Sequence, residues 1–358
     1  MKIIIAYASA GRGHQTAAES VYNCLKVSAP QAEVKIIDIL SHTKPGFSSF
    51  YSKGYSFLAS HLTPLWAVLF FITNNAFVRK ALNSLSRRNC KSFSDLLTRE
   101  NPDAIVVTHF FPADAVSYLK AKNKITSRLI TVITDFGVHP LWLSQKCDDY
   151  IVASEYTKEK LLLLGLAESK IKVFGIPIRT EFSSAKKAAG SNSSALLITG
   201  SFGFSFIEKM AEELQTMIKL TVVCGNNKEL YAHLKSKNYS GLDLYGFTDQ
   251  IPRIMSEVDF IITKPGGLSI AEALAMELPM ILIRGIPGQE TENAKIMIDS
   301  GCALEAKDTQ EVKDIVRDWK NNPDKLNRVR QNIQKIKKPD STQELCKYVR
   351  SSSPGPSG

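Results

Sequence analysis

The residues of this sequence that are suited to chemistry lie in glycine-rich turns between short apolar stretches. In the stretch at 263–283, TKPGGLSIAEALAMELPMILI, a Pro-Gly-Gly turn precedes a small-residue segment with a helical pattern. Adjacent glycines let the backbone approach a ligand closely, and the free N–H groups at the start of a helix favour an anion. Glu272, one turn further on, could accept hydrogen bonds from a ribose diol. The stretch therefore predicts a nucleotide site, although a capping box at Ser269-x-x-Glu272 would satisfy the helix without a ligand.

The first loop of the chain carries a histidine. Gly11, Gly13 and Ala17 fit the G-x-G-x-x-A pattern of a dinucleotide-binding loop, and Asp38 ends the next apolar stretch. His14 stands at the expected start of a helix, where the helix dipole lowers its pKa and keeps the ring neutral. It could therefore act as a general base, and the alternative is a loop histidine without chemistry.

Further titratable side chains follow the apolar stretches at 104–108 and 129–134, which we expect to be strands. His109 follows the first stretch, and Asp135 and His139 follow the second. In open parallel sheets, ligands bind outside the carboxyl ends of the strands. We therefore expect these side chains to face the same ligand as His14.

A pair of polar residues, Gln289 and Glu290, begins another expected helix after a strand. Such a pair could bind the hydroxyls of a sugar, although acidic residues in a first helical turn also suit the dipole alone. Lys264, beside the Pro-Gly-Gly turn, could contribute positive charge or be an ordinary solvated lysine. No Asp-x-Asp pair occurs in the sequence, which disfavours a diphosphate held by a metal ion.

Two similar halves are needed to position these residues. Apolar strands alternate with helices from residue 2 to 174, and the strand, glycine turn and helix plan starts again at 195. We expect an α/β fold with two Rossmann-like domains facing a cleft. The predicted parts are an N-terminal domain at 1–176, a C-terminal domain at 177–336, a C-terminal helix at 337–350 and a disordered tail at 351–358.

The composition narrows the class of protein. With 358 residues, 44% hydrophobic and 22% charged, the chain is long enough for two soluble globular domains. A net charge of +10 favours anionic partners such as nucleic acid, anionic lipid or nucleotide phosphates. The six cysteines form no C-x-x-C pair, so neither a zinc site nor a disulfide framework is indicated, and a reducing compartment is expected.

Membrane contact is expected to be peripheral. The N-terminus lacks the plan of a secretion signal, and the longest apolar run, at 65–72, is too short to span a bilayer. The segment 47–88 combines aromatic and basic side chains, which suits a surface lying on anionic lipid, while a buried helical pair with a basic rim would look similar. Its members are Phe47, Phe50, Tyr51, Tyr55, Phe57, Trp66, Phe70, Phe71 and Phe77, followed by Arg79, Lys80, Arg87 and Arg88.

These motifs resemble those of the monogalactosyldiacylglycerol synthase and processive diacylglycerol glucosyltransferase family, which is related to the peptidoglycan N-acetylglucosaminyltransferase. The matching segments follow one another from residue 8 to 294. They are ASAGRGHQTAA at 8–18, VITDFGVHPLW at 132–142, GIPIRTEF at 175–182, the long stretch at 245–282 that includes the Pro-Gly-Gly turn, and PGQETENA at 287–294.

The resemblance implies a GT-B glycosyltransferase that inverts the anomeric centre and needs no metal ion or cofactor. It would transfer a hexose, glucose or galactose, from a UDP-sugar to diacylglycerol. It would be cytoplasmic, attached peripherally to the cytoplasmic face of a membrane through about 47–88, and would have no nucleic-acid partner. The open alternatives are another lipid-linked acceptor, UDP-N-acetylglucosamine as the donor, a nicotinamide-dependent oxidoreductase, and a nucleotide-sugar-binding protein without catalysis.

The resemblance also assigns roles to particular residues. The implied catalytic residues are His14, Asp135 and His139. The implied donor-binding residues are Gly200, Ser201, Gly203, Phe247, Gly266, Gly267, Ser269, Glu272, Gln289 and Glu290, with Phe247 beside the uracil. The implied acceptor side comprises Gly11, Arg12, Gly13 and Trp142. Arg12 departs from the Gly-Gly-Gly-His loop of the family, and its cation could clamp a diphosphate or obstruct the acceptor.

Overall fold

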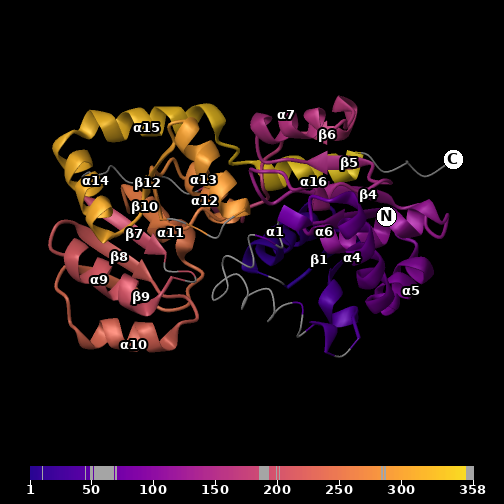
Figure 1. Cartoon of the computed structure of the whole chain (residues 1–358), viewed down its shortest axis with the longest axis horizontal. Coiled ribbons are helices and arrows are strands. Elements are labelled where there is room, and N and C mark those ends of the chain that lie inside the picture. The colour runs from indigo at the N-terminus through magenta and orange to yellow at the C-terminus, as the bar shows by residue number, and fades with distance from the viewer. Residues whose placement is uncertain are drawn as a thin grey trace. The chain divides into compact units, whose positions relative to one another are not determined.

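The chain folds into two compact units. The computed structural model describes residues 1–9, 11–44, 46–48, 51, 68, 71–184, 193–198, 200, 202–283, 285 and 288–351. The first unit comprises Met1–Thr180, Ile286–Gln289 and Asp340–Gly358, and the second comprises Glu181–Gly285 and Glu290–Pro339. The predicted α/β fold with two Rossmann-like domains is confirmed, because each unit contains a parallel six-stranded sheet with helices between its strands (Figure 1).

The sheet of the first unit has the strand order β2-β1-β3-β4-β5-β6, with every neighbouring pair parallel. Its strands are β1 (Lys2–Tyr7), β2 (Glu33–Asp38), β3 (Ala104–Val107), β4 (Arg128–Val132), β5 (Asp149–Ile151) and β6 (Ile171–Lys172). Its helices are α1 (Arg12–Ser28), η1 (Ile39–His42), α4 (Ala76–Asn89), α5 (Lys91–Glu100), α6 (Phe110–Ala121), η2 (Pro140–Trp142), α7 (Glu155–Leu163), η3 (Glu168–Lys170) and α16 (Ser341–Ser351).

Both faces of this sheet are covered, which explains why its strands read as continuous apolar runs. Ile3 and Ile5 of β1 pack on the face that α1 and α16 cover. Ile4 and Ala6 point to the opposite face, into the core that includes α5 and α6. The two-residue alternation of the strand therefore supplies both cores at once.

The last helix of the chain, α16, completes the first unit. In Figure 1 this yellow helix lies beside indigo α1, from the other end of the chain. Leu345, Cys346 and Val349 are buried in the same cluster as Val21 and Leu25 of α1. The sequence predicted the helix but not the unit to which it belongs.

The second unit repeats the plan with the order β12-β11-β10-β7-β8-β9, also parallel throughout. Its strands are β7 (Ser194–Ile198), β8 (Lys219–Val223), β9 (Leu242–Tyr245), β10 (Phe260–Thr263), β11 (Met280–Ile283) and β12 (Ala303–Ala306). Its helices are α8 (Glu181–Ser184), α9 (Phe204–Leu214), α10 (Lys228–Ser236), α11 (Ile251–Ser256), α12 (Gly267–Ala275), α13 (Gln289–Asp299), α14 (Thr309–Asn321) and α15 (Pro323–Ile336).

Each sheet has a point where the order of strands reverses. In the first unit this point lies between β1 and β3, and in the second it lies between β7 and β10. In open parallel sheets, ligands bind outside the carboxyl ends of the strands at such a point. The residues directly after these four strands are therefore the first to examine for a site.

Candidate active site

His14 lies at the reversal point of the first sheet, in the first turn of α1 after β1. Its Nδ1 is 2.8 Å from the backbone carbonyl of Thr108, directly after β3, and 2.8 Å from the hydroxyl of Thr134, after β4. The Thr108 hydroxyl in turn donates to the backbone carbonyl of His14 at 2.8 Å. Three neighbouring strands thus fix the position of one imidazole ring.

These contacts also fix the tautomer of His14. A carbonyl oxygen can only accept a hydrogen bond, so Nδ1 carries the proton and Nε2 keeps its lone pair. In the described part of the chain, Nε2 makes no hydrogen bond. Burial lowers the pKa of His14 to about 4, although the bond to the Thr108 carbonyl acts in the opposite direction. The arrangement provides a neutral imidazole with a lone pair available to take a proton.

A second histidine, His109, packs against the first. It is almost fully buried, and its ring meets that of His14 edge to face with centroids 4.6 Å apart. Its Nδ1 accepts the backbone N–H of Phe111 at 3.0 Å and so caps α6. Burial, and then the nearby His14, hold the pKa of His109 well below its ordinary value. Two neutral histidines thus lie side by side. The sequence grouped these two residues but predicted a neutral ring only for His14.

The other predicted residues on this side follow β4. Asp135 is half-buried, and His139 is buried and caps η2, where its Nδ1 accepts the backbone N–H of Leu141 at 3.1 Å. Trp142 ends η2 and is buried, with its ring centroid 6.2 Å from that of His14 and 6.4 Å from that of His109. The structure therefore brings Trp142 to the histidine pair.

The first loop holds the remaining residues of the predicted acceptor side. Gly11 has φ +125°, a conformation that favours glycine, and precedes Arg12, which begins α1 with an exposed side chain. Gly13 follows, half-buried. Asp38 accepts the backbone N–H groups of Ser9 and Leu40 at 3.1 and 3.0 Å. The carboxylate that suggested a dinucleotide site thus holds the loop and η1 together.

The reversal point of the second sheet presents helix starts. α12 begins at Gly267 with Gly266 as its N-cap, and α9 begins after Gly203. Among the described residues, no side chain caps either helix. The capping-box alternative is therefore wrong, because Ser269 lies inside the first turn of α12 and not at its N-cap. The first N–H groups of α12 are left for another acceptor.

The glycines here differ in what requires them. Gly200, after β7, has φ +51° and is favoured by its conformation. Gly203 and Gly266 have φ −65° and −71°, which any residue adopts, and an added Cβ at either would meet no described atom within 4 Å. Neither backbone strain nor packing in the described chain explains these two glycines, whereas close approach of a ligand would.

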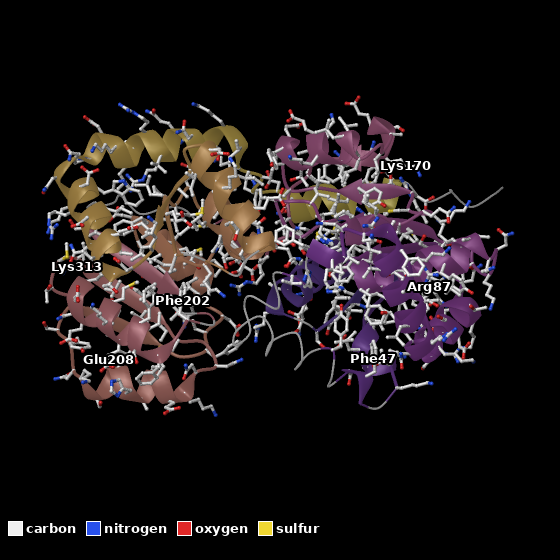
Figure 2. The ribbon with its side chains drawn as sticks, viewed as in Figure 1. Phe47, Arg87, Lys170, Phe202, Glu208 and Lys313 are labelled. Atoms are coloured by element: carbon white, nitrogen blue, oxygen red, sulfur yellow. The ribbon has the colours of Figure 1, made fainter. Side chains whose placement is uncertain are left out.

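Charged and polar side chains surround the Pro265 turn. Lys264 forms an ion pair with Glu290 of α13 at 3.6 Å, and its ammonium lies 6.0 Å from the centre of the Phe202 ring, which Figure 2 labels. Asn293, fully buried, donates to the carbonyl of Pro265 at 3.1 Å. The sequence missed Asn293, although it stands in the PGQETENA segment.

The other predicted donor residues are placed as follows. Glu272 is buried on α12, Gln289 begins α13 and is half-buried, and Phe247 follows β9 with 56% of its surface exposed. Ser201 lies outside the described residues. An exposed aromatic ring is suited to stacking on a flat base. Among the described residues, no three His, Cys, Asp or Glu side chains are grouped to hold a metal ion.

The segment 47–88 divides into two kinds of surface. Phe47, labelled in Figure 2, and Tyr51 pack on Phe111 of the core. Their ring centroids lie 6.1 and 5.5 Å from that of Phe111. Phe71 and Phe77 are 64% and 80% exposed, and no side chain of α4 is buried. Phe50, Tyr55, Phe57, Trp66 and Phe70 lie outside the described residues. Of the helices searched in the described ranges, none has the length and apolarity to cross a membrane.

Comparison with known families confirms the resemblance seen in the motifs. Residues 14–178 match the model of the monogalactosyldiacylglycerol (MGDG) synthase family. Residues 195–345 match the glycosyltransferase family 28 C-terminal domain. The first match contains the histidine pair and the second contains the α9 and α12 helix starts.

Similar proteins extend over nearly the whole chain. Processive diacylglycerol beta-glucosyltransferases of Bacillus pumilus and Bacillus subtilis are each 28% identical, covering 97% of this chain and 94% of the relative. The structure of MurG from Acinetobacter baumannii covers 98% of this chain and 99% of its own, with a TM-score of 0.63 and 14% identity. The fold is thus GT-B, and the chain is a glycosyltransferase.

Proposed function

We propose that this glycosyltransferase, which combines an MGDG synthase-like half with a family 28 C-terminal half, transfers a hexose from a UDP-sugar to diacylglycerol. The observation that carries the proposal is His14, a neutral imidazole with Nδ1–H donated to the Thr108 carbonyl and a lone pair on Nε2. Transfer to a hydroxyl needs such a base. The names of the Bacillus relatives support diacylglycerol as the acceptor and glucose as one candidate hexose.

In the proposed reaction, Nε2 of His14 takes the proton of the acceptor hydroxyl while its oxygen attacks the anomeric carbon. The bond from that carbon to the UDP oxygen breaks, UDP leaves with the electron pair, and the configuration inverts. His109 and Trp142 hold the base in place through ring contacts. Asp135 would assist on the acceptor side.

The proposed donor site uses the start of α12. Its uncapped N–H groups and the ammonium of Lys264 would stabilise the charge that develops on UDP, without a metal ion or cofactor. Gly203 and Gly266 would leave room for the diphosphate, Glu272 would accept from the ribose, and Phe247 would stack on the uracil. Gln289 and Glu290 would bind the hydroxyls of the hexose.

The proposed location is the cytoplasmic face of a membrane, with peripheral attachment. The exposed apolar side chains of the membrane-facing surface, Phe71, Ile72, Phe77, Leu82 and Leu85, are accompanied by Arg79, Lys80 and Arg88. Apolar groups beside cations suit the interface of an anionic bilayer. This surface would bring the enzyme to an acceptor that is itself a lipid.

The test is release of UDP by the purified protein with diacylglycerol in mixed micelles. UDP-glucose, UDP-galactose and UDP-N-acetylglucosamine are compared, and samples without lipid measure hydrolysis of the donor. We expect lipid-dependent release with glucose or galactose, and thermal protection by UDP but not by NAD. Release only with UDP-N-acetylglucosamine would contradict the hexose donor, and protection without release would contradict diacylglycerol as the acceptor.

A further inference from the structure

His139 uses both of its ring nitrogens within the first unit. Nδ1 accepts the backbone N–H of Leu141, so in the neutral ring the proton is on Nε2. Nε2 lies 3.2 Å from the hydroxyl of Thr73 and donates to it. A ring held in this way has no lone pair to offer to an acceptor. The sequence assigned His139 to catalysis, whereas this geometry is that of a bridge between two segments.

On one side, the bridge reaches the start of α4. The carbonyl of Thr73 accepts from Arg79 Nη1 at 3.2 Å, and Asn75 caps the helix by accepting the backbone N–H of Phe77 at 2.8 Å. Thr73 is therefore attached to the first turn of the helix that carries the membrane-facing surface.

The far end of α4 is held by polar contacts as well. Asp114 of α6 accepts from the Arg87 guanidinium at 2.6 and 2.7 Å and from Asn83 Nδ2 at 2.8 Å. Arg87, labelled in Figure 2, also lies over the ring of Tyr118 at 4.6 Å. No side chain of α4 is fully buried, and in the described part of the chain these polar contacts and the Thr73 bridge help to join this helix to the unit.

On the other side, the bridge reaches the histidine pair, His14 and His109. His139 caps η2, and η2 ends in Trp142, whose buried ring packs near His14 and His109. The contacts thus run without a break from Arg79 through Thr73 and His139 to Trp142 and the base. A contiguous network of this kind can carry coupling, and coupling has to be measured.

We propose that His139 is a positioning residue that couples docking of α4 on a membrane to the acceptor wall formed by η2 and Trp142. This inference rests on the proposed function. When α4 lies on the lipid, Thr73 is fixed, and its bond to His139 holds Trp142 against His14. One hydrogen bond of this strength gives an effect of about 3- to 10-fold, not an all-or-none switch.

The experiment compares two rates of the full-length protein. One is measured on vesicles that contain anionic lipid and diacylglycerol, and the other on a soluble short-chain diacylglycerol without vesicles. Thr73→Val replaces the hydroxyl with a methyl group of similar size. We expect the vesicle-to-soluble ratio of rates to fall about 3- to 10-fold while sedimentation with vesicles is retained. Thr73→Ser keeps the hydroxyl and should restore the wild-type ratio.

Thr98→Val is the matched control, because Thr98 is exposed on α5 and its hydroxyl donates to the Ser94 carbonyl of its own helix. It should keep the wild-type ratio. A double-mutant cycle with Phe77→Ser then tests the coupling. Once the exposed ring is removed from α4, Thr73→Val should lower the ratio little further. Additive effects would overturn the inference.

The failure of this inference differs from failure of the proposed function. Suppose that the wild type transfers a hexose to diacylglycerol. If Thr73→Val then has the wild-type vesicle-to-soluble ratio, or if Thr73→Ser lowers that ratio as much as Thr73→Val does, the bridge has no role in coupling. If the wild type transfers nothing to diacylglycerol in either form, the proposed function is wrong, and the inference is overturned with it.

Discussion

The points where the strand order reverses have the same topology in the two sheets, but different chemical groups lie there. In the first unit, the point between β1 and β3 holds side chains, with His14 fixed by Thr108 and Thr134. In the second unit, the point between β7 and β10 presents backbone N–H groups, at the starts of α9 and α12, where no side chain caps Gly203 or Gly266. One parallel sheet can thus present either a titratable group or a set of N–H donors.

The difference follows from what each half is proposed to do. Moving a proton requires a side chain whose pKa the surroundings can set, whereas holding a diphosphate requires several donors and room to approach. The two units should therefore respond to opposite kinds of mutation. Removing a side chain should matter most in the first unit, and adding one should matter most in the second.

The largest effect is expected from removing the base. His14→Ala should reduce kcat by about 10²–10⁴-fold, the usual contribution of a general base, with UDP binding retained. His42→Ala, at a half-buried histidine of η1 outside the proposed site, is the matched control and should keep the wild-type rate. Steady-state rates and UDP titrations measure both. An unchanged rate in His14→Ala would move the base to Asp135 and remove the contrast between the halves.

A smaller effect, on UDP affinity, is expected from Gly266→Ala, which adds one methyl group. The methyl would obstruct a phosphate, and loss of a hydrogen bond to a charged group is worth about 1.5–3 kcal/mol, so UDP affinity should fall about 10- to 100-fold. The melting temperature should stay the same, because φ −71° suits alanine and an added Cβ meets no described atom. Calorimetric titration and thermal unfolding measure the two quantities.

Gly301→Ala supplies the reverse pattern. Gly301 has φ +66° and precedes β12, so it lies at the amino ends of the strands and not at the carboxyl ends. An added Cβ there would lie 2.6 Å from Asn332 Nδ2. This variant should be less stable and should bind UDP as well as the wild type. If Gly266→Ala instead lost stability and kept its affinity, the glycine would serve packing and not a ligand.

The smallest effect is a dependence of stability on pH that belongs to the first unit. The pKa of His14 is lowered from its ordinary 6.5 to about 4, so the unfolded chain binds more protons between these values. The free energy of unfolding should therefore fall as pH drops from 6.5 towards 4, by at most about 1.4 kcal/mol per pH unit for this histidine. Urea unfolding of wild type and His14→Asn measures it, and equal slopes would contradict the lowered pKa.

Much of the fold and part of the site could be predicted from the sequence. Strands buried on both faces, such as 104–107, leave continuous apolar runs, and the turns after them are marked by glycine or histidine. Once the strands are known to be parallel, their carboxyl ends share one edge, which is why His14 and His109 could be grouped in advance.

The remainder depends on contacts between distant residues. The tautomer of His14 is set by Thr108 and Thr134, which are 94 and 120 positions away and have no distinctive pattern of their own. The bridging role of His139 depends in the same way on Thr73. The start of α12 could not be fixed either, because a periodic pattern leaves the first residue of a helix uncertain and Ser269 was as good a cap by type as Gly266.

The position of α16 imposes an order on the folding of the newly made chain. All of the second unit lies within residues 181–339, so its core can form once that stretch has left the ribosome. The first unit is made earlier but needs Leu345, Cys346 and Val349 to cover α1. Its apolar surface on α1 therefore stays uncovered through synthesis of the other half, and a nascent chain stopped before Ser341 presents that surface to chaperones.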